Sequence, residues 1–366
     1  MTSCSESGNP KPSKATRYTP ARRRRGTFAS TECPRAVGGR ARTGLVLAML
    51  LWSGTAVLHA QTPPDSAAEL LSAVVGVEAE VPSSARTADS LGTHRSGSGV
   101  VIDDRGHVLT IGYLILEAAR AEIVLPDART VPAEIVAYDH ASGFGLLRAI
   151  ADTGVTAMRL GVSAELDEGD PVLVVSRSGA TAAQPAVVVS RRTFAGYWEY
   201  LLERAIFTAP PHPRFGGAAL VGTDGRLLGI GSLYVGDAGT PSVAGNMFVP
   251  IDGLKPILRE LREHGRARAP PQPWLGVYTV ERGGRLTVRR LAEDGPAAAA
   301  GLEPGDVIVA IGGETITSQA DFYRKLWARG DAGVKVPLSV VRSERRIELI
   351  VKSANREAWL RLDPAL

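Results

Sequence analysis

Short runs of apolar and β-branched residues, separated by turns rich in glycine and aspartate, most constrain what this chain can fold into. Many short strands at even spacing are typical of an all-β barrel or sandwich. We therefore expect a mainly β fold in the first two thirds of the sequence. The predicted strands are Ala73–Val81, Gly99–Ile102, His107–Thr110, Glu122–Leu125, Ala133–Ala137, Pro171–Val175, Ala186–Ser190, Ala205–Thr208, Ala218–Val221, Leu227–Gly231 and Asn246–Pro250.

The periodicity then changes to that of a helix. Leu254, Ile257, Leu258 and Leu261 lie at helical spacing, and the sequence predicts a helix capped by Asp252 and ended by Gly265. The next segment, 266–273, is rich in Arg, Ala and Pro and is typical of a stiff exposed linker. Because 366 residues suit two domains better than one, we place a domain boundary at this linker.

A second module of about 80 residues is predicted to start at Trp274. Its helix is expected to begin at Ser318, where Ser-Gln-Ala-Asp has the form of a capping box. Its strands are predicted near Gly276–Val280, Leu286–Leu291, Val307–Ile311, Val336–Val341 and Arg346–Lys352.

The N-terminal 60 residues resemble an export signal. Arg40 and Arg42 precede an apolar run from Gly44 to Trp52, which is followed by the small residues Ala56 and Ala60. We expect cleavage near Ala60, with an uncleaved membrane anchor as the alternative. Both cysteines, Cys4 and Cys33, precede this point, so the mature chain is expected to have none.

The charge distribution argues against nucleic acid as a partner. Residues 1–60 hold ten Lys and Arg against two Glu, a net charge of +8, whereas the whole chain has +4. The remaining 306 residues therefore carry a net charge of −4. A nucleic-acid-binding protein needs a basic surface to neutralise phosphates, and this part of the chain is slightly acidic.

The most specific stretch is residues 296–313, with the sequence PAAAAGLEPGDVIVAIGG. This stretch resembles the PDZ domains of bacterial HtrA-type proteins, and the resemblance covers nearly all of 273–352. It implies that a peptide C-terminus adds as a strand beside a loop whose backbone N–H groups hold its carboxylate. The resemblance places this peptide-binding loop at Trp274, Leu275, Gly276 and Val277, with Phe322 and Leu326 of the helix lining the far wall. The alternative is that Trp274, Phe322 and Leu326 are only core residues.

The preceding region resembles the trypsin-like domain of HtrA proteins. The segment SGSGVVIDDRGHVLT at 96–110 is similar to its opening hairpin, GAALVGTDGRLLGI at 217–230 to the stretch after the nucleophile, and FVPID at 248–252 to the strand before the closing helix. The resemblance implies a trypsin-like double β-barrel followed by a PDZ domain. The predicted layout is an extension with signal peptide at 1–60, a lead-in at 61–71, the protease-like domain at 72–265, the linker at 266–273 and the PDZ domain at 274–355.

Alignment to the family's motifs indicates a substituted catalytic triad. The family's Thr-Asn-Asn-His-Val is TIGYL here, which puts Tyr113 in place of the histidine; SGFGLL puts Gly143 in place of the aspartate. HPRFGGA puts Gly216 in place of the serine and Arg214 in place of a glycine in the oxyanion loop. Since nucleophile, base and orienting carboxylate act as a unit, we expect a protein that is not an enzyme.

The resulting hypothesis is a non-catalytic binding, chaperone or regulatory role in envelope protein quality control. The expected partners are C-terminal or unfolded peptides and proteins, together with a homo-oligomer or an active relative; a membrane is a partner only if the signal segment is uncleaved. The periplasm is the expected compartment. No cofactor or metal is expected, because ligand spacings are missing.

The alternative function is a serine-type endopeptidase that is active through displaced residues. Such a site would draw on His107, His140 or His212, together with Asp139 and either Ser142 or Ser190.

Overall fold

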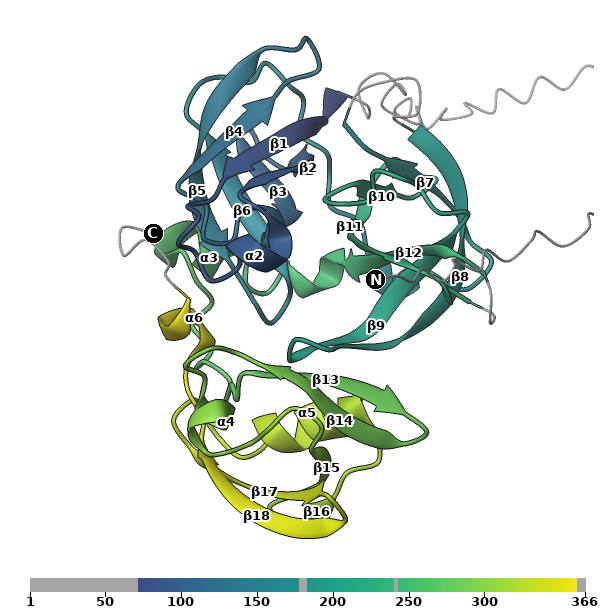
Figure 1. Ribbon diagram of the computed structural model, residues 1–366. Helices are drawn as coiled ribbons and strands as arrows, with labels where there is room; N and C mark the ends of the chain where they lie inside the picture. The colour runs from purple at the N-terminus through teal and green to yellow at the C-terminus, as the bar shows by residue number, and fades with distance from the viewer. Residues whose placement is uncertain (1–71, 178–182, 240–242, 361–366) are drawn as a thin grey trace, which may run out of the picture. The chain divides into compact units, whose positions relative to one another are not determined.

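The computed structural model describes residues 72–177, 183–239 and 243–360. The predicted signal peptide, the lead-in at 61–71 and both cysteines lie outside the described residues. The predicted mainly β architecture is confirmed: strands form two closed barrels and a further sheet (Figure 1).

The first barrel has six antiparallel strands in the order β1-β2-β3-β6-β5-β4. They are β1 (Val74–Glu80), β2 (His94–Val101), β3 (His107–Ile111), β4 (Arg120–Val124), β5 (Thr130–Tyr138) and β6 (Phe144–Ala149). The sequence predicted all of these strands except β6. The residues of β6 were aligned with the family's aspartate motif but were not predicted to form a strand. The short helix α2 (Ala88–Leu91) lies between β1 and β2, and a 3-10 turn η1 (Gly112–Leu114) follows β3.

The second barrel repeats this plan in the order β10-β11-β12-β9-β8-β7. Its strands are β7 (Pro171–Val175), β8 (Ala183–Gly196), β9 (Tyr200–Ala209), β10 (Ala219–Val221), β11 (Leu227–Val235) and β12 (Gly245–Pro250). Strands β8 and β9 are much longer than predicted, and they pair as far as Gly196 with Tyr200. The tip of this hairpin therefore consists of the three residues 197–199.

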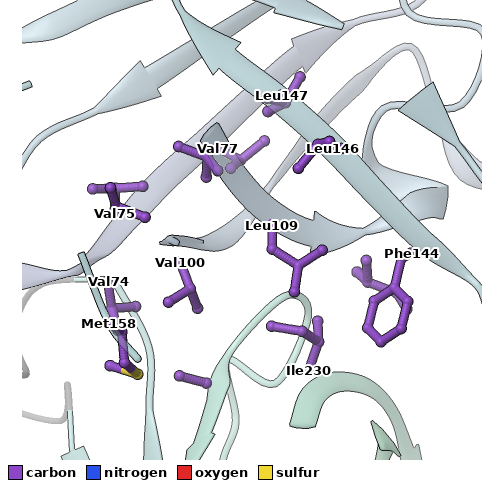
Figure 2. Packing of buried hydrophobic residues seen from close by; sticks show 14 of the residues in the cluster. Val74, Val75, Val77, Val100, Leu109, Phe144, Leu146, Leu147, Met158 and Ile230 are labelled. Carbon is purple, nitrogen blue, oxygen red and sulfur yellow. The ribbon is translucent and has the colours of Figure 1, made fainter. Parts of the chain in front are cut away.

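A shared apolar cluster fills the first barrel and reaches the second (Figure 2). Val77, Val100, Leu109 and Leu146 are completely buried in it, and Ile230 of β11 packs into the same cluster. Close packing of this kind fixes strand register, because a shift of one residue would turn each of these side chains to the opposite face.

The helix after the barrels is shorter than predicted. A 3-10 turn η3 (Ile251–Gly253) comes first, and α3 (Leu258–His264) begins only after Ile257. Asp252 is therefore not its N-cap, and that expectation is wrong. The Asp252 carboxylate instead accepts hydrogen bonds from the Ser163 hydroxyl at 2.9 Å and the Ala164 N–H at 2.7 Å, beside the 3-10 turn η2 (Ser163–Glu165). The predicted end at Gly265 is confirmed, with a left-handed φ of 70°.

The C-terminal module contains a sheet in the order β13-β14-β15-β17-β18, with β16 paired to β15. Its strands are β13 (Val277–Arg282), β14 (Arg285–Leu291), β15 (Val307–Ile311), β16 (Glu314–Thr315), β17 (Lys335–Arg342) and β18 (Arg345–Lys352). Its helices are α4 (Pro296–Ala299), α5 (Gln319–Trp327) and α6 (Arg356–Trp359), of which only α5 was predicted. The predicted cap is confirmed, because the Ser318 hydroxyl accepts from the Asp321 N–H at 3.0 Å.

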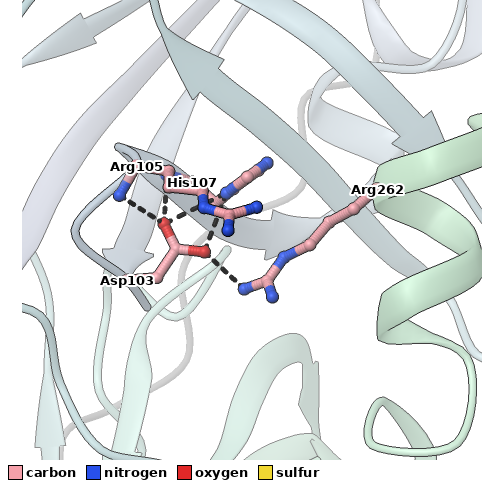
Figure 3. Close-up of polar contacts among 4 residues, drawn as sticks. All are labelled: Asp103, Arg105, His107 and Arg262. Carbon is pink, nitrogen blue, oxygen red and sulfur yellow. Dashed lines mark hydrogen bonds and ion pairs between the residues drawn. The ribbon is translucent and has the colours of Figure 1, made fainter.

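A buried carboxylate connects the first barrel to α3 (Figure 3). Asp103, in the turn between β2 and β3, accepts hydrogen bonds from the backbone N–H of Arg105 at 3.0 Å and from His107 Nδ1 at 2.8 Å. It also pairs with Arg262 of α3. Burial raises the pKa of Asp103, but hydrogen bonds from His107 and the charge of Arg262 outweigh it and hold that pKa below its usual value.

We expect Asp103→Asn to lower the free energy of unfolding by about 1–3 kcal/mol, because charge-assisted hydrogen bonds at a mostly buried site are lost. Urea denaturation measures this, with Asp127→Asn at an exposed ion pair as the control. Since the folded state lowers the pKa of Asp103, its contribution is complete at neutral pH. The difference between wild type and variant should shrink as the pH falls below about 4. An unchanged difference at low pH would contradict this explanation.

Candidate functional site

A cleft of about 650 Å³ lies where the two barrels meet, and it contains positions 113 and 216, which the sequence analysis aligned with the family's histidine and serine. Tyr113 of η1, Arg214, Phe215 and Gly216 line it. The Tyr113 hydroxyl donates to the Ser232 carbonyl at 3.0 Å, and burial raises the pKa of this phenol above its usual range. At neutral pH Tyr113 is therefore a hydrogen-bond donor and does not accept protons as a base.

Tyr113 and Gly216 compete for the same space. A Cβ atom on Gly216 would lie 2.9 Å from the Tyr113 hydroxyl oxygen, closer than packed atoms allow. The Gly216 carbonyl accepts from the Ser98 N–H at 2.9 Å, so the backbone there cannot easily move away. The large side chain at position 113 therefore fits because position 216 has no side chain.

The third position, Gly143, lies next to these two. Its carbonyl accepts from the Gly112 N–H at 2.8 Å, immediately before Tyr113. A Cβ atom at Gly143 would lie 2.8 Å from the hydroxyl oxygen of Tyr200, which donates to the Ser142 carbonyl at 2.9 Å. The fold brings positions 113, 143 and 216 together, and tyrosine side chains fill the space beside both glycines.

The loop before Gly216 is held by His212. This histidine is fully buried, its N–H donates to the Asn246 side-chain oxygen at 2.6 Å, and its Nδ1 accepts from the Arg214 N–H at 3.0 Å. The backbone N–H of Arg214 is therefore directed to His212.

The other residues of the displaced-site alternative are dispersed. His107 is paired with Asp103, and Ser190 is buried in β8. Ser142 donates to the Asp139 carboxylate, and both residues line a larger cavity of about 1260 Å³ together with His140.

His140 is fully occupied by its neighbours. Its Nε2 lies 2.8 Å from the Arg356 guanidinium nitrogen and 3.1 Å from the Glu199 carbonyl oxygen, and its Nδ1 lies 3.0 Å from the Tyr138 hydroxyl. Burial and the charge of Arg356 lower the pKa of His140 well below its usual value. His140 is therefore neutral at physiological pH.

The predicted peptide-binding loop contains a built carboxylate site. The backbone N–H groups of Leu275, Gly276 and Val277 donate to the carboxylate of Glu199 at 2.9, 2.7 and 2.9 Å. Gly276 has a φ of +78°, a left-handed conformation that glycine adopts readily and that lets three successive N–H groups converge. Glu199 lies at the tip of the β8–β9 hairpin, and the sequence analysis did not identify it.

The other predicted peptide contacts are core residues. Phe322 and Leu326 are fully buried, in a cluster that Ala195 and Leu201 of the β8–β9 hairpin also join, and their contact with a peptide stays a prediction. Trp274 is 5% exposed, pairs through its backbone with Ala354, and packs against Trp359 at 4.8 Å between ring centroids. Two residues of α5 meet the hairpin: the Tyr323 hydroxyl donates to the Gly196 carbonyl, and Arg324 donates to Glu203 of β9. The sequence analysis identified neither.

Burial dominates the electrostatics of Glu199. It raises the pKa of this carboxyl to about 7, against the three N–H donors and Arg356, which lower it.

Among residues 72–177, 183–239 and 243–360, no group of three His, Cys, Asp or Glu side chains is placed to hold a metal ion.

Comparison with known proteins identifies both folded parts. Residues 97–230 match the family model of the trypsin-like peptidase domain, and residues 273–352 match that of the PDZ domain. The chain joins a trypsin-like barrel domain to a PDZ domain.

The curated proteins that this chain resembles are named serine proteases. A probable periplasmic serine endoprotease, DegP-like, from Pseudomonas fluorescens is 28% identical over 279 residues, which are 71% of this chain and 57% of the relative. The serine protease Do-like HtrA of Bacillus subtilis is 24% identical over 292 residues, 72% of this chain and 64% of the relative. The chain thus spans little more than half the length of the first of these relatives.

A solved structure of a variant of the HtrA-type protease AlgW with a tripeptide is similar in fold. It covers 81% of this chain and 97% of that chain, with 22% sequence identity and a TM-score of 0.51. At this identity the likeness concerns the fold alone.

The comparisons correct one expectation. The chain was expected not to be an enzyme, and this is contradicted because the relatives are named serine endoproteases, which points to a protease. Several of these names also include the periplasm. Within the part of the chain that the structure describes, no helix has the length and apolar character needed to cross a membrane.

The contact between positions 113 and 216 can be tested by a double-mutant cycle. We expect Gly216→Ala to lower the free energy of unfolding by about 1–3 kcal/mol, because its Cβ would strike the Tyr113 hydroxyl. In a Tyr113→Phe background this cost should largely disappear, because the nearest remaining ring carbon is 3.9 Å away. Urea denaturation of the four proteins measures the coupling, and additive effects would refute the shared-space explanation.

Proposed function

We propose that this chain is an exported, periplasmic protein that binds polypeptide C-termini through its PDZ domain and acts in envelope protein quality control. The observation that carries the proposal is the convergence of the Leu275, Gly276 and Val277 N–H groups on one carboxylate. A polypeptide ends in the same chemical group, and capture of a terminal carboxylate by successive backbone N–H groups is a recurring mode of peptide recognition. The periplasmic location is supported by the names of the relatives.

Matched glycine variants test the loop. We expect the purified chain to bind a fluorescein-labelled pool of hexapeptides with free C-termini more tightly than the same pool with amidated C-termini. Gly276→Ala should remove most of this preference, because a side chain disfavours the left-handed backbone that aims the N–H groups. Gly283→Ala is the control, since Gly283 also has a positive φ but lies in the β13–β14 turn. Fluorescence anisotropy measures binding, and equal affinity of wild type for both pools would refute the proposal.

A second candidate function, endoproteolysis of the bound polypeptides, is favoured by the names of the curated relatives. We propose that Tyr113, Gly143 and Gly216 occupy the positions at which this family has histidine, aspartate and serine. Since Gly216 has no hydroxyl group, hydrolysis by this chain needs a nucleophile elsewhere. Ser142 is a candidate, because its hydroxyl meets the Asp139 carboxylate at the wall of the larger cavity.

Activity labelling tests this second function. The names of the relatives predict that the purified chain hydrolyses unfolded casein, and that a fluorophosphonate forms an adduct with the responsible serine. Mass spectrometry locates the adduct, and replacing that serine by alanine should abolish both labelling and hydrolysis, while Ser90→Ala, in exposed α2, should change neither. The absence of both hydrolysis and adduct would refute endoproteolysis by this chain.

A further inference from the structure

The tip of the β8–β9 hairpin has an unusual backbone. Gly196 pairs with Tyr200, so the loop has three residues, and Glu199 is the last of them with a φ of +58°. Three-residue hairpin loops commonly end in a left-handed residue, and glycine is preferred there because other side chains strain the backbone. A glutamate at this position therefore needs compensating contacts, and strained residues of this kind gather at functional sites.

The compensation is the carboxylate site of the PDZ loop. One oxygen of Glu199 accepts from Gly276 and Val277 and the other from Leu275, so both oxygens are engaged. Glu199 is 2% exposed, which removes the carboxylate from water. No other group can enter the loop while this side chain is in place.

One backbone hydrogen bond also joins the hairpin tip to β13. The Thr279 N–H donates to the Tyr197 carbonyl at 3.2 Å, two residues along the strand from the loop. From α5, the Tyr323 hydroxyl donates to the Gly196 carbonyl at 2.7 Å and accepts from the Glu199 N–H at 3.2 Å. Addition of an extended segment beside a strand, with its carboxylate in the adjoining loop, is the geometry of PDZ ligands.

Further contacts fix the tip in this position. Arg356 of α6 donates to the Trp198 carbonyl at 2.8 Å, and the Trp198 ring stacks on Tyr200 at 5.7 Å with an interplanar angle of 11°. Ala195 and Leu201, on either side of the tip, pack against the apolar core of the PDZ domain. Apolar, polar and charged contacts thus hold this one hairpin against the loop at Leu275–Val277 and against α5.

From this geometry we propose that the hairpin tip, residues 197–199, is an internal ligand of the PDZ domain, and that a polypeptide C-terminus binds only by displacing Glu199 from the loop. The inference rests on the proposed C-terminal binding and adds its regulation. The incoming terminus replaces one carboxylate by another on the same three N–H groups. The affinity for an external peptide is therefore set by the difference in free energy between the loop bound to the peptide and the loop bound to Glu199.

Two substitutions at one position test the displacement. Glu199→Gly removes the carboxylate and places the preferred residue at the left-handed position, so the hairpin should remain folded. We expect Glu199→Gly to bind the pool of free-carboxylate hexapeptides roughly tenfold more tightly than wild type, because no internal competitor has to leave. Glu199→Gln keeps the size of the side chain and an acceptor oxygen but has no charge, like the protonated carboxyl that docks most strongly, so it should bind the pool no more tightly than wild type. Glu134→Gln, at an exposed ion pair in the first barrel, is the control and should bind as wild type does.

Amide hydrogen exchange tests the same proposal without a ligand. In wild type the Leu275, Gly276 and Val277 amides should be protected, and Glu199→Gly should accelerate their exchange while that of the β17–β18 amides is unchanged. Saturating free-carboxylate peptide should restore protection of the loop and expose the amides at the hairpin tip. Unchanged exchange at the loop in Glu199→Gly would overturn the proposal.

The two proposals fail in different ways. If neither wild type nor the variants distinguish free from amidated peptides, C-terminal binding is refuted, and exchange at the loop still decides whether Glu199 occupies it. If all proteins prefer free carboxylates with equal affinity, C-terminal binding stands and displacement of an internal ligand is refuted.

The occupied loop should also respond to pH. Because burial raises the pKa of Glu199 to about 7, the docked hairpin binds a proton more tightly than the released one. Docking is therefore strongest at low pH and weakens as the pH rises through 7. The other groups around the tip keep their charge state in this range: Arg356 is cationic, while His140 and Tyr323 are neutral.

We expect the affinity of wild type for the free-carboxylate pool to rise between about pH 5.5 and about pH 8, with a smaller change in Glu199→Gly. Anisotropy titrations at the two pH values measure it, and an equal response of both proteins would contradict the assignment of this dependence to Glu199.

Discussion

The carboxylate of Glu199 and the three N–H groups that bind it determine how the PDZ domain presents its binding loop. Successive backbone N–H groups at Leu275, Gly276 and Val277 point to one place, and buried N–H groups without an acceptor are costly. The acceptor must be water, a bound terminus or a side chain of the same protein. In this chain it is a side chain, and the left-handed backbone of Glu199 and the length of the β8–β9 hairpin both serve to deliver it.

The packing around Gly143 and Gly216 illustrates a different constraint: two atoms cannot occupy the same space. Tyr113 with Gly216, in the cleft between the barrels, and Tyr200 with Gly143 are two pairs in which a phenol fills the space that a side chain on the glycine would need. Such pairs are coupled, because changing either member alone leaves a clash or a void. The effect of a substitution at one member of such a pair therefore has to be interpreted together with its partner.

The relatives indicate how far a fold carries function. This chain keeps the trypsin-like and PDZ patterns, which depend on buried apolar positions and turns. The names of the relatives point to a protease, whereas catalytic chemistry depends on particular side chains in the cleft. Position 216 is glycine in this chain, so chemical labelling is the experiment that tests for a nucleophile elsewhere.

The sequence by itself determined most of the strands, the end of α3 at Gly265 and the Ser318 cap, because these features depend on local periodicity and on residues close in the chain. It missed β6, predicted β8 and β9 too short and misplaced the cap at Asp252, since the ends of strands and helices depend on contacts with distant segments. Only the tertiary structure could decide that Glu199, more than 70 residues before the loop, occupies it. The physical reason is that hydrogen bonds and burial between distant segments leave no periodic signal in the sequence, and a lone glutamate at a hairpin tip resembles any exposed turn residue.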